Sequence, residues 1–218
     1  DWVDKLFVYC IVSTVIGARL GHCLFYEWDY YSVHPAEILK IWKGGLASHG
    51  GVFAIILALV WYSKKVTKKS VWWLFDRMIP AVAVVCFCIR FGNLMNSEIY
   101  GYPTTLPWGF EFVRSREWHQ LYEGLPCHPT QIYEMLYCLV AGVTAWVMYH
   151  KYHLQNRVGL ITGVSLLIFF GSRFALEFMK NPQVVEETNM TLNIGQWLSV
   201  PLILLGGYLI YKSKTAKV

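Results

Sequence analysis

Charged residues are scarce in this sequence: aspartate, glutamate, lysine and arginine together make up only 15% of its 218 residues. A soluble domain usually carries about 25% charged residues. Hydrophobic residues make up 56% of the chain, and the mean hydropathy is +0.38. The shortage of charge therefore argues against a soluble domain and favours a membrane protein.

Several motifs of other protein classes are also missing. The net charge is +5, but no basic stripe with interleaved aromatic residues occurs, so no nucleic-acid partner is expected. No CxxC pair and no cysteine–histidine set has zinc-ligand spacing, so neither a metal nor another cofactor is expected. The six cysteines lie mostly in apolar runs and are expected to be buried small hydrophobic residues. Cys127, in a polar loop, is the one expected to be exposed.

Six segments are apolar enough, and long enough, to cross a bilayer as helices of about 20 residues. They are residues 6–26, 46–63, 73–96, 131–150, 158–179 and 194–211. The sequence therefore predicts an all-α, polytopic membrane helical bundle, with one integral membrane domain over residues 1–218. Residues 97–130, rich in Trp, Tyr, Pro and Gly, are predicted to form a small ordered extracytoplasmic cap. The alternative is that these aromatic residues rest in the interfacial belt.

The placement of basic residues predicts the orientation, because short cytoplasmic loops carry an excess of lysine and arginine. Three regions show this excess: Lys64, Lys65, Lys68 and Lys69; Lys151 and Arg157; and Lys212, Lys214 and Lys217. The loops between them balance basic residues with acidic ones. Both ends of the chain are therefore predicted to be cytoplasmic. The chain begins at Asp1 without a signal peptide, so we expect an N-terminal piece to be missing.

Polar residues interrupt five of the six spans, although an arginine or glutamate at membrane depth costs from about 2.5 kcal/mol upward. They are Arg19 in GARLGH, His49 in GGLASHGG, Arg90, Asn93, Asn96 and Glu98 at the end of the third span, Gln131 and Glu134 in HPTQIYE, and Arg173 and Glu177 in GSRFALEFMK. In the predicted orientation all of them lie near the outer membrane surface. This convergence predicts one water-accessible chamber.

The spacing and the residue types indicate what the chamber could bind. Arg90 and Asn93 share a helix face, and Arg173 and Glu177, four residues apart, could form a structural ion pair. Glycines at 44, 45, 50 and 51, on both sides of His49, and at 92 and 101 allow close backbone approach or a turn. Arginines bind phosphate bidentately, and a histidine can accept a proton near neutral pH, although a lone histidine is more often structural. The residues alone are compatible with a lipid-headgroup enzyme or with a transporter or channel for an anionic solute.

Six blocks of the sequence resemble the bacterial prolipoprotein diacylglyceryl transferases, in the order found in that family. They are GARLGH (17–22), GGLASHGG (44–51), RFGNLMNSEIYG (90–101), HPTQIYE (128–134), GSRFALEF (171–178) and IGQWLSVP (194–201). The third block is the family's signature segment and the most specific of them. The resemblance implies transfer of the diacylglyceryl group from phosphatidylglycerol to the lipobox cysteine of a prolipoprotein. A thioether forms and glycerol 1-phosphate leaves, in the first step of lipoprotein maturation.

The same resemblance implies roles for individual residues. His49 matches the histidine proposed as the base for the incoming thiol, Arg90 the arginine that holds the phosphate, and Arg173 a second catalytic arginine. Substrate-binding or supporting positions are matched by Arg19, Asn93, Glu98, Gly101, Gln131, Glu134 and Glu177. The resemblance further implies a bacterial inner-membrane protein, expected to be a monomer, with its site toward the outer leaflet and without a metal.

The chain departs from the family at its beginning. Members of the family have seven spans, and the first carries a tyrosine needed for activity, which neither Tyr9 nor Tyr26 is taken to replace. The nucleophile is the substrate's own thiolate, so the absence of a G-x-S-x-G motif or a catalytic cysteine is expected. Two alternative hypotheses remain. One is a transporter or channel, which the lack of an internal repeat disfavours; the other is an inactive family member that only binds its ligand.

Overall fold

A computed structural model of the chain describes residues 1–181 and 192–215. Within these residues there is no β-strand, and six helical segments are long and apolar enough to cross a membrane. These segments are Trp2–Phe25, His49–Thr67, Val71–Met95, Thr130–His150, Leu160–Met179 and Ile194–Lys214. Their ends differ from the predicted ones by a few residues. The predicted all-α bundle with six spans is therefore confirmed.

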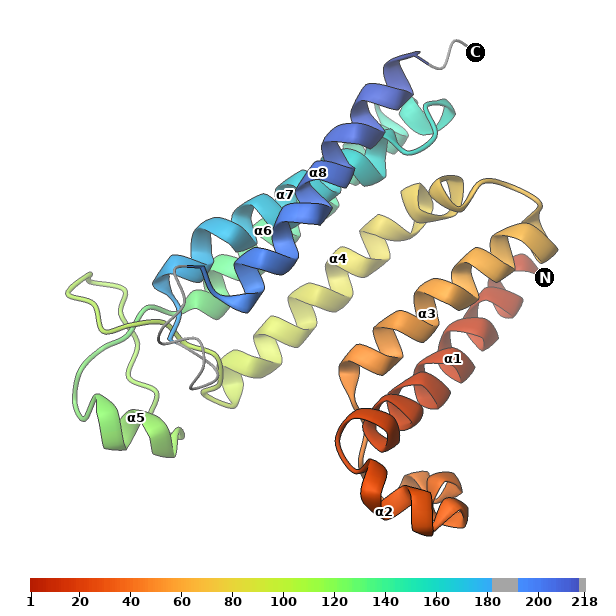
Figure 1. The fold of residues 1–218 in the computed structure, drawn as a ribbon. Helices are drawn as coiled ribbons and strands as arrows, with labels where there is room; N and C mark the ends of the chain where they lie inside the picture. Colours follow the sequence, from red (N-terminus) through yellow and green to blue (C-terminus); the bar gives the residue numbers. More distant parts are fainter. Residues whose placement is uncertain (182–191, 216–218) are drawn as a thin grey trace. The chain divides into compact units, whose positions relative to one another are not determined.

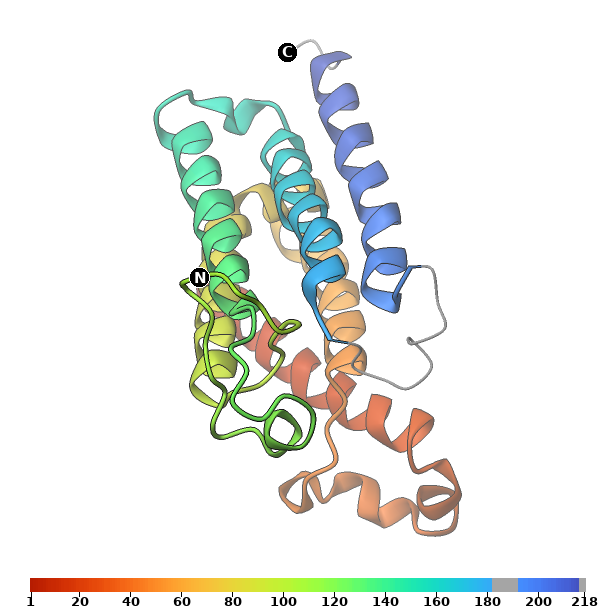
Figure 2. The same ribbon diagram turned by 90° about the vertical axis from the view of Figure 1, so that its left-hand side faces the viewer.

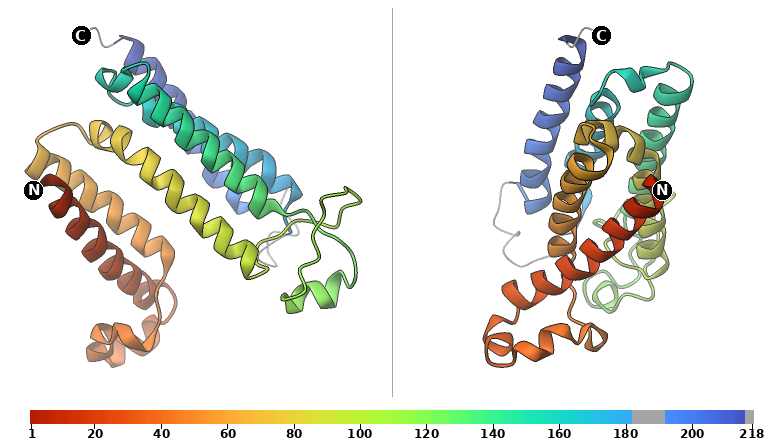
Figure 3. Two further views of the ribbon diagram at one scale, coloured as in Figure 1. Left: turned by 180° about the vertical axis from the view of Figure 1, so that it is seen from behind. Right: turned by 90° about the vertical axis from the view of Figure 1, so that its right-hand side faces the viewer.

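The chain folds as two compact units, residues 1–74 and residues 75–218. In the first unit, α1 (Trp2–Phe25) and α3 (Ser48–Tyr62) lie side by side, as Figure 1 and Figure 3 show. The connection between these two helices is also mostly helical. It consists of α2 (Trp28–Val33) and the 3₁₀ turns η1 (Pro35–Leu39) and η2 (Ile41–Lys43); a π-helical turn, η3 (Ser63–Thr67), follows α3.

Glycines set the close contact between α1 and α3. A Cβ atom added to Gly17 would lie 2.5 Å from the carbonyl oxygen of Gly50, and one added to Gly50 would lie 2.7 Å from the Cα atom of Gly21. Neither position could hold a larger residue without moving the helices apart. Small residues at such contacts are typical of helices that pack inside membranes. The close backbone approach predicted next to His49 is confirmed at Gly50.

The second unit contains the other long helices. They are most of α4 (Val71–Met95), α6 (Thr130–His150), α7 (Leu160–Leu176) and α8 (Ile194–Thr215), with the short turns η4 (Leu154–Asn156) and η5 (Glu177–Met179). Helix α7 packs against both α6 and α8 (Figure 2). Helix α4 is tied to the start of α7 by Asp76. This buried carboxylate accepts hydrogen bonds from the Gly159 amide (2.7 Å), the Thr162 amide (2.8 Å) and the Thr162 hydroxyl (2.6 Å). A carboxylate at a helix N-terminus accepts hydrogen bonds from the free amides, and its negative charge interacts favourably with the positive end of the helix dipole.

The loop between α4 and α6 has a hydrophobic cluster of its own, made of Tyr100, Phe112, Trp118 and Cys127. The rings of Tyr100 and Phe112 stack with centroids 4.6 Å apart. The short helix α5 (Arg116–Leu121) supplies Trp118, whose indole donates to the Leu125 carbonyl at 2.9 Å. Aromatic side chains in this loop thus bury each other.

One prediction about the cysteines is wrong. Cys127 is fully buried, because isolated β-bridges to Pro103 and Phe110 place it inside the aromatic cluster of the loop. Burial also raises the pKa of its thiol, because the charged thiolate is poorly solvated there. The exposed cysteine is instead Cys88, on α4.

Candidate active site

The end of α4 presents a chain of polar contacts. The guanidinium of Arg90 donates through Nη1 to Oδ1 of Asn93 at 3.3 Å, and Nδ2 of Asn93 donates to Oε2 of Glu98 at 3.2 Å. The backbone closes the same turn, since the Glu98 amide donates to the Asn93 carbonyl at 2.9 Å. The face shared by Arg90 and Asn93 was predicted from their spacing. Its extension to Glu98 requires the turn after the helix.

That turn has an unusual backbone. Ser97 and Ile99 both have φ of 58°, in the left-handed region that a β-branched residue such as isoleucine rarely adopts. Conformations of this kind cost of order 1–3 kcal/mol each and persist only where surrounding contacts fix them. The start of α6 supplies such contacts: the Thr130 hydroxyl donates to the Ile99 carbonyl at 2.8 Å, and Nε2 of Gln131 donates to the Glu98 carbonyl at 2.6 Å. The HPTQIYE motif thus holds the signature segment in shape.

Gly101, the last residue of the signature segment, lies against η5, the turn that follows α7. A Cβ atom here would be 2.3 Å from the Met179 carbonyl oxygen, so no other residue fits without a shift. The backbones pair at this point through a bridge between Gly101 and Lys180. The close approach predicted for Gly101 is confirmed, whereas no such contact is found at Gly92 in the described part of the chain. A Cβ atom at Gly92 would meet nothing within 4 Å among the described residues.

Buried charges connect these elements. Arg90 Nε lies 2.8 Å from Oε2 of Glu134, and Lys180 Nζ lies 2.8 Å from Oε1 of the same carboxylate and 3.3 Å from Oε2 of Glu177. The Glu134 side chain is completely buried and that of Lys180 is 3% exposed. The alternative of an ion pair between Arg173 and Glu177 is wrong, because the buried amine of Lys180 takes the Glu177 carboxylate instead.

Arg90 and Arg173 both line a cavity of about 280 Å³ between α4, α6 and α7. Its other walls are apolar for the most part and include Ile79, Ile89, Leu166, Phe169 and Phe170. Tyr137 also lines it and donates from its hydroxyl to Oε1 of Glu134 at 3.3 Å. Within residues 1–181 and 192–215, Arg173 has no ion-pair partner. An apolar cavity with two arginines suits an amphipathic anion.

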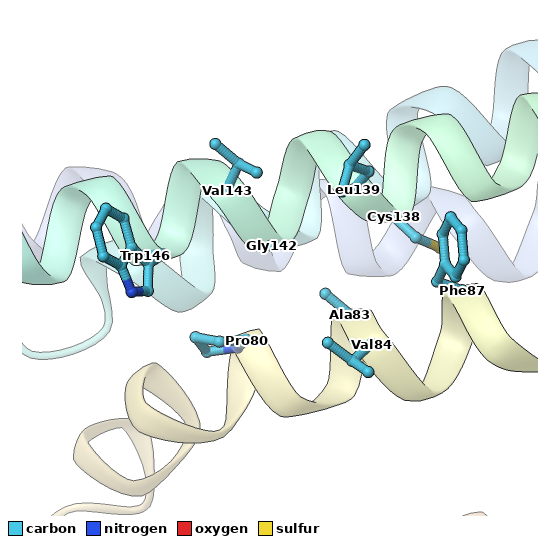
Figure 4. A pocket seen from close by; sticks show the side chains of 9 residues that line it. All are labelled: Pro80, Ala83, Val84, Phe87, Cys138, Leu139, Gly142, Val143 and Trp146. Carbon is cyan, nitrogen blue, oxygen red and sulfur yellow. The ribbon is translucent and has the colours of Figure 1, made fainter.

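A second cavity between α4 and α6 has a different character. Its volume is about 350 Å³ and its nine lining residues, shown in Figure 4, carry no charge. The α4 side presents Pro80, Ala83, Val84 and Phe87, and the α6 side presents residues from Cys138 to Trp146. Cys138 lines both cavities. The second cavity can accept apolar groups only.

Arg19, in the first unit, is held very differently. Nε donates to the Ile38 carbonyl (2.9 Å), and the terminal nitrogens donate to four further carbonyl oxygens. These acceptors are Gly44 (2.6 Å) and Gly45 (3.1 Å) for Nη1, and Glu37 (2.7 Å) and Lys40 (3.4 Å) for Nη2. A guanidinium has five N–H donors, so all of them are used. The group is buried and lies over the Tyr31 ring at 5.0 Å. Arg19 thus fixes the connection between α1 and α3.

The same connection carries an ion-pair cluster at its surface. The Glu37 carboxylate accepts hydrogen bonds from Nζ of Lys40 and from Nζ of Lys43, the latter at 2.7 Å. These hydrogen bonds lower the pKa of Glu37 to about 2. The bond to Glu37 raises the pKa of Lys43 in turn. Glu37 therefore stays ionised at any physiological pH.

His49 lies in the first turn of α3, and its side chain is exposed in the first unit. Among the described residues it has no hydrogen-bond or ion-pair partner. Arg19 and His49 belong to the first unit, whereas the other predicted site residues belong to the second. Within the second unit the structure brings together Arg90 and seven further predicted residues: Asn93, Glu98, Gly101, Gln131, Glu134, Arg173 and Glu177. A chamber that also includes His49 stays a prediction.

Lys180 is the residue that sequence reasoning missed. A lysine at the end of a span is ordinarily expected to extend its amine to the membrane surface. The one signal was its position three residues after Glu177, which places the two side chains on the same helix face. The buried partner on α6, Glu134, lies 46 positions earlier in the chain. No spacing rule connects residues so far apart.

Comparison with known proteins gives a consistent result. Residues 1–212 match the family model for prolipoprotein diacylglyceryl transferase. The chain is similar to the phosphatidylglycerol–prolipoprotein diacylglyceryl transferase of Porphyromonas gingivalis, with 47% identity over 97% of this chain and 77% of the relative. The enzymes of the same name from Chloroherpeton thalassium (45% identity; 98% of this chain and 77% of the relative) and Tolumonas auensis (40%; 100% and 81%) are also similar.

The six long apolar helices define a polytopic membrane protein, and two of its arginines, Arg90 and Arg173, line one largely apolar cavity. The chain belongs to the prolipoprotein diacylglyceryl transferase family, as its sequence motifs indicated. It is a multi-pass membrane protein with six candidate spans in the described residues. The alternative of a transporter or channel receives no support from these relatives, each of which is named as a transferase.

Proposed function

We propose that this protein transfers the diacylglyceryl group of phosphatidylglycerol to the lipobox cysteine thiol of prolipoproteins. The observation that carries the proposal is the cavity lined by both Arg90 and Arg173. Guanidinium groups suit the phosphate of the lipid, because they bind its oxygens bidentately and keep their charge. The apolar walls of the cavity suit the acyl chains. The names of the relatives support the same substrates.

The reaction requires one bond to form and one to break. The thiolate of the lipobox cysteine attacks the carbon of the diacylglyceryl group that bears the phosphate. A C–S bond forms at this carbon while its C–O bond to the phosphate breaks. The bonding electrons leave with the oxygen as glycerol 1-phosphate. His49 accepts the proton of the incoming thiol, whose ordinary pKa of about 8.5 leaves it mostly protonated at neutral pH.

Arg90 and Arg173 stabilise the charge that grows on the departing phosphate, since fixed cations are most effective where water is excluded. Arg90 can do so because its Nε faces Glu134 and its Nη1 lies at Asn93, which leaves donors on the terminal nitrogens for a ligand. Asn93, Glu98, Gln131 and Gly101 shape this end of the site. For Arg19 we propose a positioning role, because its donors are all used by the backbone.

We further propose that the protein lies in the bacterial inner membrane, with this site toward the outer leaflet. The lysines in the loops predicted to be cytoplasmic support this orientation. So does the substrate, because the lipobox cysteine of a secreted prolipoprotein becomes accessible on the outer side.

The proposal is tested by incubating the purified protein with phosphatidylglycerol and a lipobox peptide, followed by mass spectrometry of the peptide. The expected result is a mass gain of one diacylglyceryl group together with release of glycerol 1-phosphate. A peptide with serine in place of the lipobox cysteine, and vesicles of phosphatidylcholine alone, serve as controls. No mass gain, with an active relative assayed in parallel, would refute the transferase function.

The assignment of His49 as the base has its own test in the same assay. His49→Gln should lower the rate about 10²- to 10⁴-fold, the range typical of general base catalysis. Because thiolate forms without help at high pH, the deficit should shrink as the pH approaches the thiol pKa. A near-normal rate of the variant at pH 7 would remove His49 from the mechanism.

A further inference from the structure

The second unit contains five charged side chains at or near the cavity: Arg90, Glu134, Lys180, Glu177 and Arg173. Ion pairs join the first four, with distances of 2.8 Å, 2.8 Å and 3.3 Å. The fifth, Arg173, lines the cavity and is left without an ion pair among the described residues. Two carboxylates and three cations thus share one region, and their pairing decides which cation is left for a ligand.

Lys180 is the member shared by both carboxylates. The Glu134 side chain is completely buried and that of Glu177 is 7% exposed, so each needs a counter-charge. Within the described part of the chain, one oxygen of each carboxylate, Oε2, accepts no hydrogen bond. These two atoms depend on their ion pairs, Arg90 Nε for Glu134 and Lys180 Nζ for Glu177.

The backbone fixes Lys180 in this place. It is bridged to Gly101 of the signature segment, and the next residue, Asn181, donates from Nδ2 to the Gly101 carbonyl at 3.2 Å. The hydroxyl of Tyr122 donates to Oδ1 of Asn181 at 3.0 Å. Gly195, at the start of α8, packs so closely on the Glu177 carboxylate that a Cβ atom there would lie 2.5 Å from Oε1. Both partners of the ion pair are therefore held in position.

Without Lys180, the nearest cation for Glu177 on its own helix would be Arg173, four residues earlier, a spacing at which opposite charges pair readily. Such a pair would neutralise Arg173, the arginine of the cavity that has no counter-ion among the described residues. We propose that Lys180 is a positioning residue of the headgroup site. By holding Glu177 away from Arg173, it keeps the Arg173 guanidinium group available for a phosphate. This inference rests on the proposed function.

The proposal is tested with four variants assayed for kcat and KM toward phosphatidylglycerol: Lys180→Met, Lys180→Arg, Glu177→Gln and the double variant Lys180→Met/Glu177→Gln. Lys180→Met should lower kcat/KM about 10- to 100-fold, an effect typical of misplaced binding groups, chiefly through a higher KM for the lipid. Lys180→Arg, which keeps the charge, should restore most of the activity. Lys151→Met is the matched control, because Lys151 is exposed beyond the other end of α6.

The double variant separates charge pairing from a merely structural role. Once Glu177 is neutral, nothing competes for Arg173, so the double variant should have a kcat/KM within about threefold of Glu177→Gln alone, as expected for two coupled residues. If the loss of kcat/KM in the double variant equalled the losses of the two single variants combined, the proposal would be overturned. An unchanged kcat/KM in Lys180→Met would overturn it as well. If Lys180→Met fails to fold, the double variant carries the test, since the proposal requires it to fold and to keep that kcat/KM. An inactive wild-type protein would instead refute the proposed function.

Discussion

Two arginines of this protein, Arg19 and Arg90, have opposite surroundings. Arg19 gives all five of its N–H donors to backbone carbonyls of residues 37–45. Arg90 is paired with the side chains of Glu134 and Asn93 and lines a cavity that also holds Arg173. Both are costly residues within predicted spans, and that cost alone does not distinguish them.

The difference separates two uses of the same side chain. A guanidinium surrounded by carbonyls stabilises one conformation of the chain and has no donor left for a ligand. A guanidinium held on one edge by a carboxylate is aligned, and its remaining donors can still meet an anion. We therefore expect substitution of Arg19 to act on stability and substitution of Arg90 to act on the reaction.

The largest effect is expected for Arg90→Ala. Loss of a group that stabilises transition-state charge typically lowers the rate about 10²- to 10³-fold, and kcat with phosphatidylglycerol and a lipobox peptide should fall by that amount. The variant should still fold, because Glu134 keeps Lys180 as a partner, but the melting temperature should fall, because Oε2 of the buried Glu134 loses its ion pair. The kcat of Arg90→Lys, which retains a charge but not the planar fork, should lie between that of the wild type and that of Arg90→Ala. An unaltered kcat in Arg90→Ala would contradict the role in the reaction that distinguishes Arg90 from Arg19.

The reverse pattern is expected for Arg19→Met. This change leaves buried carbonyl oxygens without donors, at about 1–3 kcal/mol for an unsatisfied group, and the connection between α1 and α3 should loosen. Faster trypsin cleavage after Lys40 and Lys43, together with a lower melting temperature, would report this. The rate per folded molecule should stay close to that of the wild type, with Lys5→Met as a matched surface control. A large loss of kcat at full stability would instead place Arg19 among the binding groups.

An intermediate effect on both properties is expected for Gly101→Ala. The added methyl group would lie 2.3 Å from the Met179 carbonyl, and overpacking of this kind costs about 1–3 kcal/mol. Because the same contact places Lys180, the KM for phosphatidylglycerol should rise as well. Gly92→Ala is the matched control, since its methyl group would meet nothing within 4 Å among the described residues. Equal behaviour of the two variants would contradict the role given to the Gly101 contact.

The sequence predicted the spans well because each one is set by local composition. It also predicted the face shared by Arg90 and Asn93, since residues three apart on a helix are neighbours. It could not predict that Glu177 pairs with Lys180 rather than Arg173, because that choice depends on Glu134, which lies on another helix. The exposure predicted for Cys127 was wrong for the same reason. Polar residues precede and follow this cysteine in the sequence, but the folded loop brings distant aromatic side chains around it.

The smallest effect is expected from Glu37, at the surface of the connection that Arg19 holds from inside. Hydrogen bonds from Lys40 and Lys43 lower its pKa to about 2, below the ordinary glutamate value of about 4.3. A lowered pKa means that the stabilisation is fully present above about pH 4.3 and is lost as the pH falls through about 2. The melting temperatures of wild type and Glu37→Gln should therefore differ by a small constant amount from pH 7 to 5, and the difference should shrink below about pH 4.3 and disappear as the pH falls through about 2. High salt should reduce the difference at pH 7, because the pair is open to solvent. If the difference were undiminished as the pH fell to about 2, the stabilisation would have to come from the backbone that Arg19 fixes rather than from these surface charges.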